Sequence, residues 1–305
     1  ETRFRCLYFK AWWEGAPGEL LTDEEGHRRL DLKNAAGPED QPLPVRLLGK
    51  MMGMTSPDGK RWTPLAEPVL DEWHDTHNIA VYDSQAGLYR AYLRGFYGGR
   101  RAISYAETRD FAHWLPSRVI HHSLPTDAPD ESLYSNGYSR YPGCSELHLM
   151  FPAIYRQSED ITYGQLAVSQ DGVNWARLTG QALIPQGPPG APDGGMVYPE
   201  PELLRCPERG VMRLLCHCGP RYHNEWYNER LRTGETSYYC WAEWPEDRLA
   251  GVVAEATGSF TLPPQPCGDR LLANYRCQPG GWVKFELVDR LVWPPQPWPG
   301  IPGFR

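Results

Sequence analysis

The chain has 305 residues, which is enough for one large domain or for one domain with an appendage. Thirty Gly, thirty Pro, 12 Trp and 17 Tyr predict short strands and tight turns rather than helices. The formal net charge is -7 and the basic residues are dispersed, which argues against a nucleic-acid partner. No apolar run approaches the roughly 20 residues of a membrane helix, so we expect no membrane partner.

The eight cysteines do not have the spacing of a disulfide framework. Cys216-His217-Cys218 has the composition of a metal-binding fragment, but no second Cys/His pair accompanies it. Residues i and i+2 share one face of a strand, so buried apolar thiols are the better interpretation. A hairpin disulfide between Cys206 and Cys216 is an alternative. We expect no cofactor and no metal, and a cytoplasmic and a secreted location both stay open.

The N-terminal part of the chain alternates between strand and loop composition. Residues 3–14 are rich in aromatic and β-prone side chains and predict a strand. Residues 15–44 are polar and rich in Gly, Pro and acids, which predicts a long surface loop. Residues 45–55 predict the next strand. The chain starts with Glu1-Thr2-Arg3 and without Met, so we expect it to have been cut from a longer one.

Further groups of short strands follow, separated by turns that contain Asp, Gly and Pro. From about Ala254 the sequence alternates apolar and polar residues without the earlier pattern, as in an antiparallel sandwich. The expected strands are 79–82, 88–96 and 101–107, then 134–141, 146–155 and 162–169, then 196–206, 210–217 and 237–244, and in the last segment 258–261, 270–275 and 281–287.

One turn recurs three times along the chain. Ser56-Pro57-Asp58-Gly59-Lys60-Arg61-Trp62 returns as Ser169-Gln170-Asp171-Gly172-Val173-Asn174-Trp175, with a weaker copy from Thr108 to Trp114. Repeats at such spacing are typical of propeller blades, each of four antiparallel strands. We therefore predict an all-β fold, a five-bladed-type β-propeller over residues 1–253 whose first blade is incomplete at the N-terminus. Residues 254–305 then form the start of a C-terminal β-sandwich.

These turns predict structure rather than chemistry. Gly accepts the positive φ of a tight turn, and Asp accepts hydrogen bonds from nearby backbone N–H groups. We expect the Trp to pack between neighbouring blades while its ring N–H finds a partner.

In its order of motifs the chain resembles the five-bladed propeller glycosidases of glycoside hydrolase families 32, 43 and 68. It is similar, more specifically, to bacterial relatives that pair such a propeller with a C-terminal sandwich. The resemblance implies an active site in a central funnel, with carboxylates on the inner strands, one of which would precede Glu1 here. It rests on Asp75-Thr76-His77-Asn78, Ala91-Tyr92-Leu93-Arg94, Asp110-Phe111-Ala112-His113-Trp114, Tyr134 to Pro142, Met150-Phe151-Pro152 and Gln165-Leu166-Ala167-Val168-Ser169.

Glycoside hydrolysis needs two carboxyl groups that face each other across the scissile bond. We expect Asp75, which opens a blade, to be one of them. Glu200 or Asp193, near the start of the fourth unit, is expected to be the other. Groups that could bind the sugar are His77, Asn78, Arg94, Arg140, Tyr141, Tyr155, Arg156, Tyr198, Glu202 and His223.

The function predicted from these residues is an exo-acting glycoside hydrolase with a carbohydrate as its partner. The alternatives are a carbohydrate-binding propeller without turnover and a protein-binding scaffold. A polysaccharide lyase is a separate hypothesis. It would need His77 or His223 beside a Tyr, without a pair of carboxylates.

Overall fold

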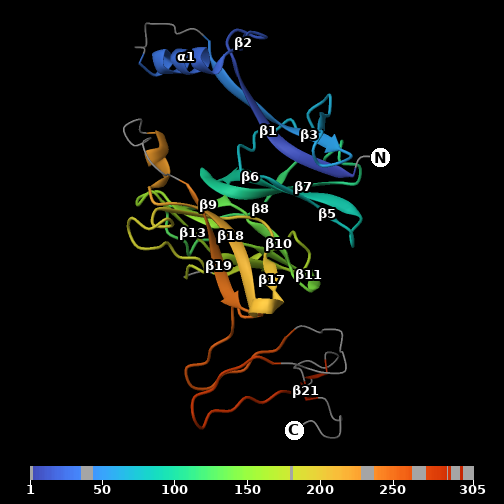
Figure 1. The fold of residues 1–305 in the computed structure, drawn as a ribbon, viewed down its shortest axis with the longest axis vertical. Coiled ribbons are helices and arrows are strands. Elements are labelled where there is room, and N and C mark those ends of the chain that lie inside the picture. Colours follow the sequence, from blue (N-terminus) through green and yellow to red (C-terminus); the bar gives the residue numbers. More distant parts are fainter. Residues whose placement is uncertain are drawn as a thin grey trace. The chain divides into compact units, whose positions relative to one another are not determined.

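A computed structural model describes residues 3–35, 44–178, 181–227, 237–262, 273–286, 288–289 and 296–297. The chain divides into two compact units, Glu1–Leu249 and Ala250–Arg305. The first unit consists of antiparallel sheets (Figure 1), so the all-β prediction is confirmed. None of the described helices is long and apolar enough to cross a membrane.

The first sheet has the order β2-β1-β3-β4, in which β1 and β3 form an eleven-residue antiparallel ladder. The loop expected over residues 15–44 is wrong in part, because a helix, α1, lies within it. Thr22 caps this helix by accepting a hydrogen bond from the Glu25 N–H, and three acidic residues in the first turn suit the helix dipole. The elements are β1 (Phe4–Glu14), β2 (Leu20–Leu21), α1 (Asp23–Ala35), β3 (Arg46–Ser56) and β4 (Thr63–Pro64).

The second sheet has the order β5-β6-β7-β8 and follows the predicted strands closely. Its central strands carry fully buried side chains, among them Tyr92, Leu93 and Ile103. The strands are β5 (Ile79–Asp83), β6 (Leu88–Tyr97), β7 (Arg100–Thr108) and β8 (Arg118–His121).

The predicted strands of the third group all break along one line, which we call the crease. Each of the three strands predicted here is broken in the middle, at Asn136-Gly137, Phe151-Pro152 and Gln165. The breaks lie side by side, because the Phe151 N–H donates to the Gly137 carbonyl and the Gln165 N–H donates to the Pro152 carbonyl. The sheet on one side of the crease has the strand order β13-β12-β9, and the sheet on the other side has the order β10-β11-β14-β15. The strands are β9 (Glu131–Ser135), β10 (Tyr138–Tyr141), β11 (Cys144–Met150), β12 (Ala153–Arg156), β13 (Ile161–Gly164), β14 (Leu166–Ser169) and β15 (Ala176–Leu178).

The last sheet of the unit is built around β18, which pairs with β16 and β17 along one edge and with β19 along the other. Its elements are β16 (Met196–Pro199), β17 (Leu204–Cys206), the 3-10 helices η1 (Pro207–Arg209) and η2 (His223–Tyr227), β18 (Val211–Gly219) and β19 (Tyr238–Pro245).

The recurring Asp turns share one hydrogen-bond pattern. Asp58, Asp110 and Asp171 each accept two backbone N–H bonds from the residues that follow, of 2.7–2.9 Å. The Trp62 and Trp114 ring N–H groups donate to a carbonyl of their own turn, whereas the Trp175 ring N–H has no partner. The Asp turns thus have the predicted hydrogen bonds, but the expectation for the Trp residues holds only in part, because the Trp175 ring N–H lacks a partner and the Trp62 side chain is exposed.

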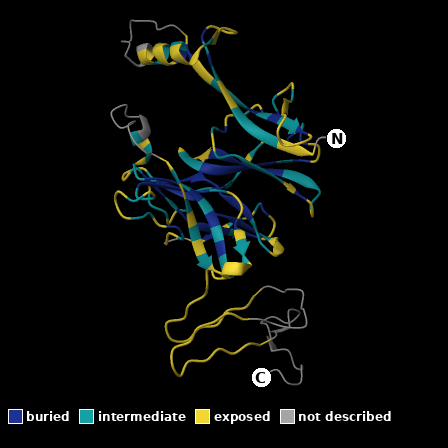
Figure 2. Ribbon diagram, viewed as in Figure 1, coloured by how far each residue is buried: buried dark blue, intermediate teal, exposed yellow. Residues whose placement is uncertain are grey.

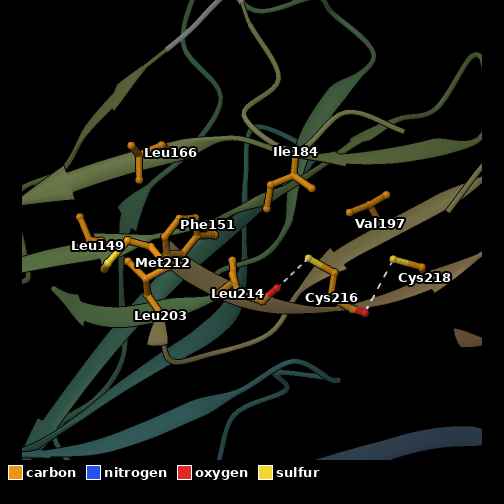
Figure 3. Packing of buried hydrophobic residues seen from close by; sticks show 10 residues of the cluster. All are labelled: Leu149, Phe151, Leu166, Ile184, Val197, Leu203, Met212, Leu214, Cys216 and Cys218. Atoms are coloured by element: carbon orange, nitrogen blue, oxygen red, sulfur yellow. Dashed lines mark hydrogen bonds between the residues drawn. The ribbon is translucent and has the colours of Figure 1, made fainter. Parts of the chain in front are cut away.

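The core between the creased strands and the last sheet is apolar and contains two thiols (Figure 3). Figure 2 shows that burial is concentrated in the strands of the first unit. Cys206 and Cys216 are free thiols, so the disulfide between them was a wrong alternative. The core residues are Leu149, Phe151, Leu166, Ile184, Val197, Leu203, Met212, Leu214, Cys216 and Cys218.

The second unit contains little regular structure among its described residues. Residues 258–261 and 281–286 are not strands, which corrects the prediction for these segments. Of the strand expected over 270–275, residues 270–272 lie outside the described residues, and 273–275 are not strand. The described strands of this unit are β20 (Val288–Asp289) and β21 (Gln296–Pro297), which pair with each other.

Candidate functional site

Six aromatic rings from distant parts of the first unit meet in one place, which we call the Tyr–His cluster. The His77 ring stacks on Tyr198 with centroids 5.3 Å apart, and the His223 ring lies 4.8 Å from Tyr134. The three tyrosines are buried, while the three histidines are half-buried. The cluster therefore has an apolar floor and accessible polar edges. Its members are His77, Tyr134, Tyr155, Tyr198, His217 and His223.

A hydrogen bond of 2.6 Å joins the Tyr198 hydroxyl to the His223 Nδ1. Tyr198 is held by the β16–β18 ladder, opposite His217. His223 opens η2, and its backbone N–H donates to the Asp160 carbonyl. A strand and a short helix from separate parts of the chain therefore fix the two partners.

Burial sets the protonation of this pair. It raises the pKa of Tyr198, so its hydroxyl is protonated at neutral pH. Burial also lowers the pKa of His223, with Arg101 and Arg94 acting in the same direction against Asp160. His223 is then a neutral imidazole. The pair consists of a phenol that can donate a proton and an imidazole that can accept one.

His77 reaches the cluster from a strained turn. Asp75 and His77 have φ values of 51° and 59°, in the left-handed region that non-Gly residues rarely adopt. The turn is held by Asn136, whose amide donates to the His77 carbonyl, and by Asn78, which donates to the Asp75 carbonyl. Burial lowers the pKa of His77 to about 4, with further lowering by Arg94 and His217.

Two arginines lie against the floor of the cluster. The Arg94 guanidinium carbon is 4.1 Å from the Tyr134 ring centroid, and the guanidinium forms an ion pair with Asp75. Arg101 lies 4.9 Å from the Tyr134 centroid and 5.4 Å from that of Tyr155. Such cation–π contacts are stabilising and orient the charge over the rings.

Asp160 borders the cluster on the side of Tyr155. Its carboxylate accepts hydrogen bonds from the Tyr155 hydroxyl, at 2.9 Å, and from the Asn224 backbone N–H, at 2.8 Å. Its φ of 57° is also left-handed. Asp75 and Asp160 are thus the carboxylates with contacts to residues at the cluster.

The predicted second carboxylates belong to a different environment. Asp193 lines a cleft of about 240 Å³ together with Cys216, Cys218 and Cys240. Burial raises the pKa of Glu200, whose charge acts on the Cys216 thiol. None of the described contacts joins either acid to Asp75. The strand ends at Pro199, so the two-residue alternation that would align Glu200 with Tyr198 does not continue.

Other predicted binding residues also have partners away from the cluster. Arg140 pairs with Asp83, and Arg156 pairs with Glu131. The Tyr141 hydroxyl bonds Asp247. Glu202 is exposed, and its backbone N–H donates to the Tyr138 carbonyl. Asn78 accepts a bond from the Arg94 backbone N–H and therefore braces the turn. The structure brings together His77, Arg94, Tyr155, Tyr198 and His223, with Asp75 beside them.

Sequence reasoning did not select Arg101, Tyr134, Asp160 or His217 as site residues. Tyr134 lies on β9, just before the break at Asn136-Gly137, and the sequence predicts one unbroken strand there. Asp160 sits in a turn between two strands and carries no motif. Within the described residues no group of three or more His, Cys, Asp or Glu could hold a metal ion.

No protein-family model and no curated protein matches this chain. Among solved structures, an N-acetylgalactosamine deacetylase from F. plautii in complex with blood group B trisaccharide is 14% identical, with a TM-score of 0.42, over 56% of this chain and 55% of that one. A glycosyl hydrolase from Bacteroides ovatus is 13% identical, with a TM-score of 0.42, over 65% and 57%. A structure described under the GH130 family of mannoside phosphorylases, which contains glycoside hydrolases that target β-1,2 mannosidic linkages in Candida mannan, is 16% identical, with a TM-score of 0.41, over 57% and 52%. The match thus spans little more than half of each of these chains.

Proposed function

We propose that this chain is a carbohydrate-active enzyme whose reaction takes place at the Tyr–His cluster, with Tyr198 and His223 transferring the protons. The observation that carries the proposal is the 2.6 Å hydrogen bond between a protonated phenol and a neutral imidazole. Aromatic faces bind the apolar faces of sugar rings, and the surrounding histidine and arginine groups can bond hydroxyls. We therefore expect a carbohydrate to bind at the edges of the cluster, where the half-buried histidines lie.

The finer fold prediction belongs to the same proposal. Residues 1–253 would form a five-bladed-type propeller, and residues 254–305 would start a second domain. Three recurring Asp turns and the succession of antiparallel sheets support it.

The proposal is tested with Tyr198→Phe, which removes the hydroxyl and keeps the ring. The first step is a screen of neutral and acidic glycans for newly formed reducing ends. On a substrate that the native chain cleaves, we expect kcat to fall about 100- to 10,000-fold, the usual contribution of a positioned acid or base. Tyr141→Phe is the control, because it also removes a tyrosine hydroxyl and its hydrogen bond, outside the cluster. The Tyr198 hydroxyl additionally lies 3.5 Å from Met196 Sδ, which is a weak acceptor. Equal kcat for Tyr198→Phe and the native chain would remove Tyr198 from the reaction.

Hydrolysis by two carboxylates is a second candidate, and it is favoured by the position of Asp75 and Asp160 on the edges of the cluster. In that case the carboxylates would act as the acid and base, and the tyrosines would hold the sugar. Asp75→Asn and Asp160→Asn would then each lower kcat more than Tyr198→Phe does. The opposite order supports the Tyr198–His223 pair.

A further inference from the structure

Among the described residues, the Arg101 guanidinium has no counter-ion. It is half-buried, its Nε is buried without a hydrogen-bond partner, and no ion pair or hydrogen bond to it exists among the described residues. Other arginines of the same unit do meet carboxylates, as Arg90 meets Asp83 and Arg177 meets Asp127. Leaving a buried charged donor unpaired costs free energy, so the position is one that a bound anion would stabilise.

The position of Arg101 is set by the cluster itself. Its guanidinium lies over Tyr134 and Tyr155, and its charge also acts on His223. Asp160 is the acidic neighbour, but its described bonds go to Tyr155 and Asn224. Arg94, by contrast, is neutralised by Asp75. Within the part of the chain that the structure describes, the cluster therefore offers one cation without a carboxylate partner beside the proton-transfer pair.

We infer that the substrate is a uronate glycan, that Arg101 binds the sugar carboxylate, and that the chain is cleaved by β-elimination. This inference rests on the proposed function. An arginine fork matches a carboxylate with two parallel hydrogen bonds, and the positive charge acidifies the ring proton next to that carboxylate. Neither effect is available to a neutral sugar, so the unpaired arginine gives the site a preference for acidic glycans.

The step balances with the groups at hand. In the tautomer in which His223 Nδ1–H donates to the Tyr198 oxygen, Nε2 is free to accept. The phenol O–H then has only the weak acceptor Met196 Sδ, 3.5 Å away, and can donate to a substrate oxygen instead. His223 takes the proton on C5, the electron pair forms the C4–C5 double bond, and the C4–O4 bond breaks. Tyr198 gives its proton to O4, which leaves as a hydroxyl. The proton on Nδ1 then passes to the Tyr198 oxygen, which leaves His223 neutral with its proton on Nε2. Proton exchange with solvent restores the Nδ1–H tautomer, and no oxidant, reductant or water is consumed.

The experiment uses the full chain, with polygalacturonate and alginate as probes and their carboxyl-reduced forms as matched neutral substrates. We expect an ultraviolet-absorbing unsaturated product from an acidic polymer and none from the reduced one. Arg101→Gln is expected to lower kcat/KM about 10- to 100-fold and to raise the Kd for galacturonate or guluronate by a similar factor. Arg101→Lys, which keeps the charge, should recover part of the loss.

Arg118→Gln is the control, because Arg118 also lies over a tyrosine ring, that of Tyr105, outside the cluster. Its kcat/KM should match that of the native chain, and thermal unfolding checks that each variant is folded. Cleavage of a neutral glycan that depends on Tyr198 but not on Arg101 would overturn this inference and leave the proposed function intact. Cleavage of an acidic glycan without an unsaturated product would overturn the elimination. If Tyr198→Phe and Arg101→Gln both cleave as well as the native chain, both proposals are wrong.

Discussion

The two faces of the last sheet differ in chemistry although the same strands supply both. On one face, Tyr198 and His217 belong to the Tyr–His cluster. On the other, Val197, Cys216 and Cys218 belong to the apolar core. Because side chains alternate along a strand, one residue of register separates a candidate reaction site from a packing surface. The type of a residue on these strands therefore does not show whether it belongs to the site until the face of the sheet on which its side chain lies is known.

The reactivity of the thiols is the largest expected difference between the faces. Burial raises the pKa of Cys216 to about 12, which lowers its thiolate fraction at pH 8 about 1000-fold relative to an ordinary thiol. We expect exposed Cys144 to react quickly with an aromatic disulfide reagent, and Cys216 and Cys218 to react only after unfolding. Time-resolved labelling followed by peptide mass analysis measures this. Rapid labelling of Cys216 in the folded chain would show that the apolar face is open.

Packing should also distinguish the faces at two adjacent leucines. Leu214 is fully buried in the core, and Leu215 next to it is half-buried on the opposite face. Leu214→Ala should lower the free energy of unfolding by about 2–5 kcal/mol, because a core cavity is created. Leu215→Ala should cost clearly less. Urea unfolding of both variants gives the comparison, and equal losses would contradict this assignment of the faces.

The pH dependence of stability is the smallest of the three effects and reports on the cluster face. The pKa of His77 is about 4 in the folded chain and about 6.5 when unfolded, so the unfolded chain binds more protons between these values. The stabilising contribution is therefore complete above pH 6.5 and is lost as the pH falls to about 4, by about 3 kcal/mol in total.

His77→Gln should flatten this part of the stability profile, measured by urea unfolding at several pH values. His121 and His148 also have lowered pKa values because of burial, so the difference between variant and native chain is the relevant quantity. His113→Gln, at an exposed position in a turn, is the control. If the free energy of unfolding of His77→Gln has the same slope against pH as that of the native chain, the His77 imidazole of the native chain is solvated rather than buried.

The sequence was informative where local chemistry decides the structure. Asp58 and Asp171 form the same turn because both the Asp oxygen and the Gly φ act within a few residues. The strands could be recognised by composition, but their breaks could not, since Phe151-Pro152 bends only in register with its neighbours. The helix α1 was missed because its side chains are mostly polar, which resembles a loop.

The site was only partly predictable, because its parts come from distant segments. Asp75-Thr76-His77-Asn78 was recognisable as an entry turn, and His77 does reach the cluster. Asp193 and Glu200 were chosen by chain order, whereas the end of β16 at Pro199 decides their environment. Arg101 carries no motif. Its lack of a side-chain partner among the described residues becomes visible only when the neighbouring carboxylates that the structure describes are assigned.

Gly137, at the crease, ties the spacing of the cluster to a single backbone position. Its φ is 51°, and a Cβ there would lie 2.6 Å from the Phe151 carbonyl oxygen and 3.1 Å from that of Pro199. Pro199 directly follows Tyr198, and Tyr134 lies three residues before Gly137. Any larger residue would therefore act as a wedge between the strands that carry two of the three tyrosines. The missing side chain at Gly137 thus lets the backbone next to Tyr134 approach the backbone next to Tyr198.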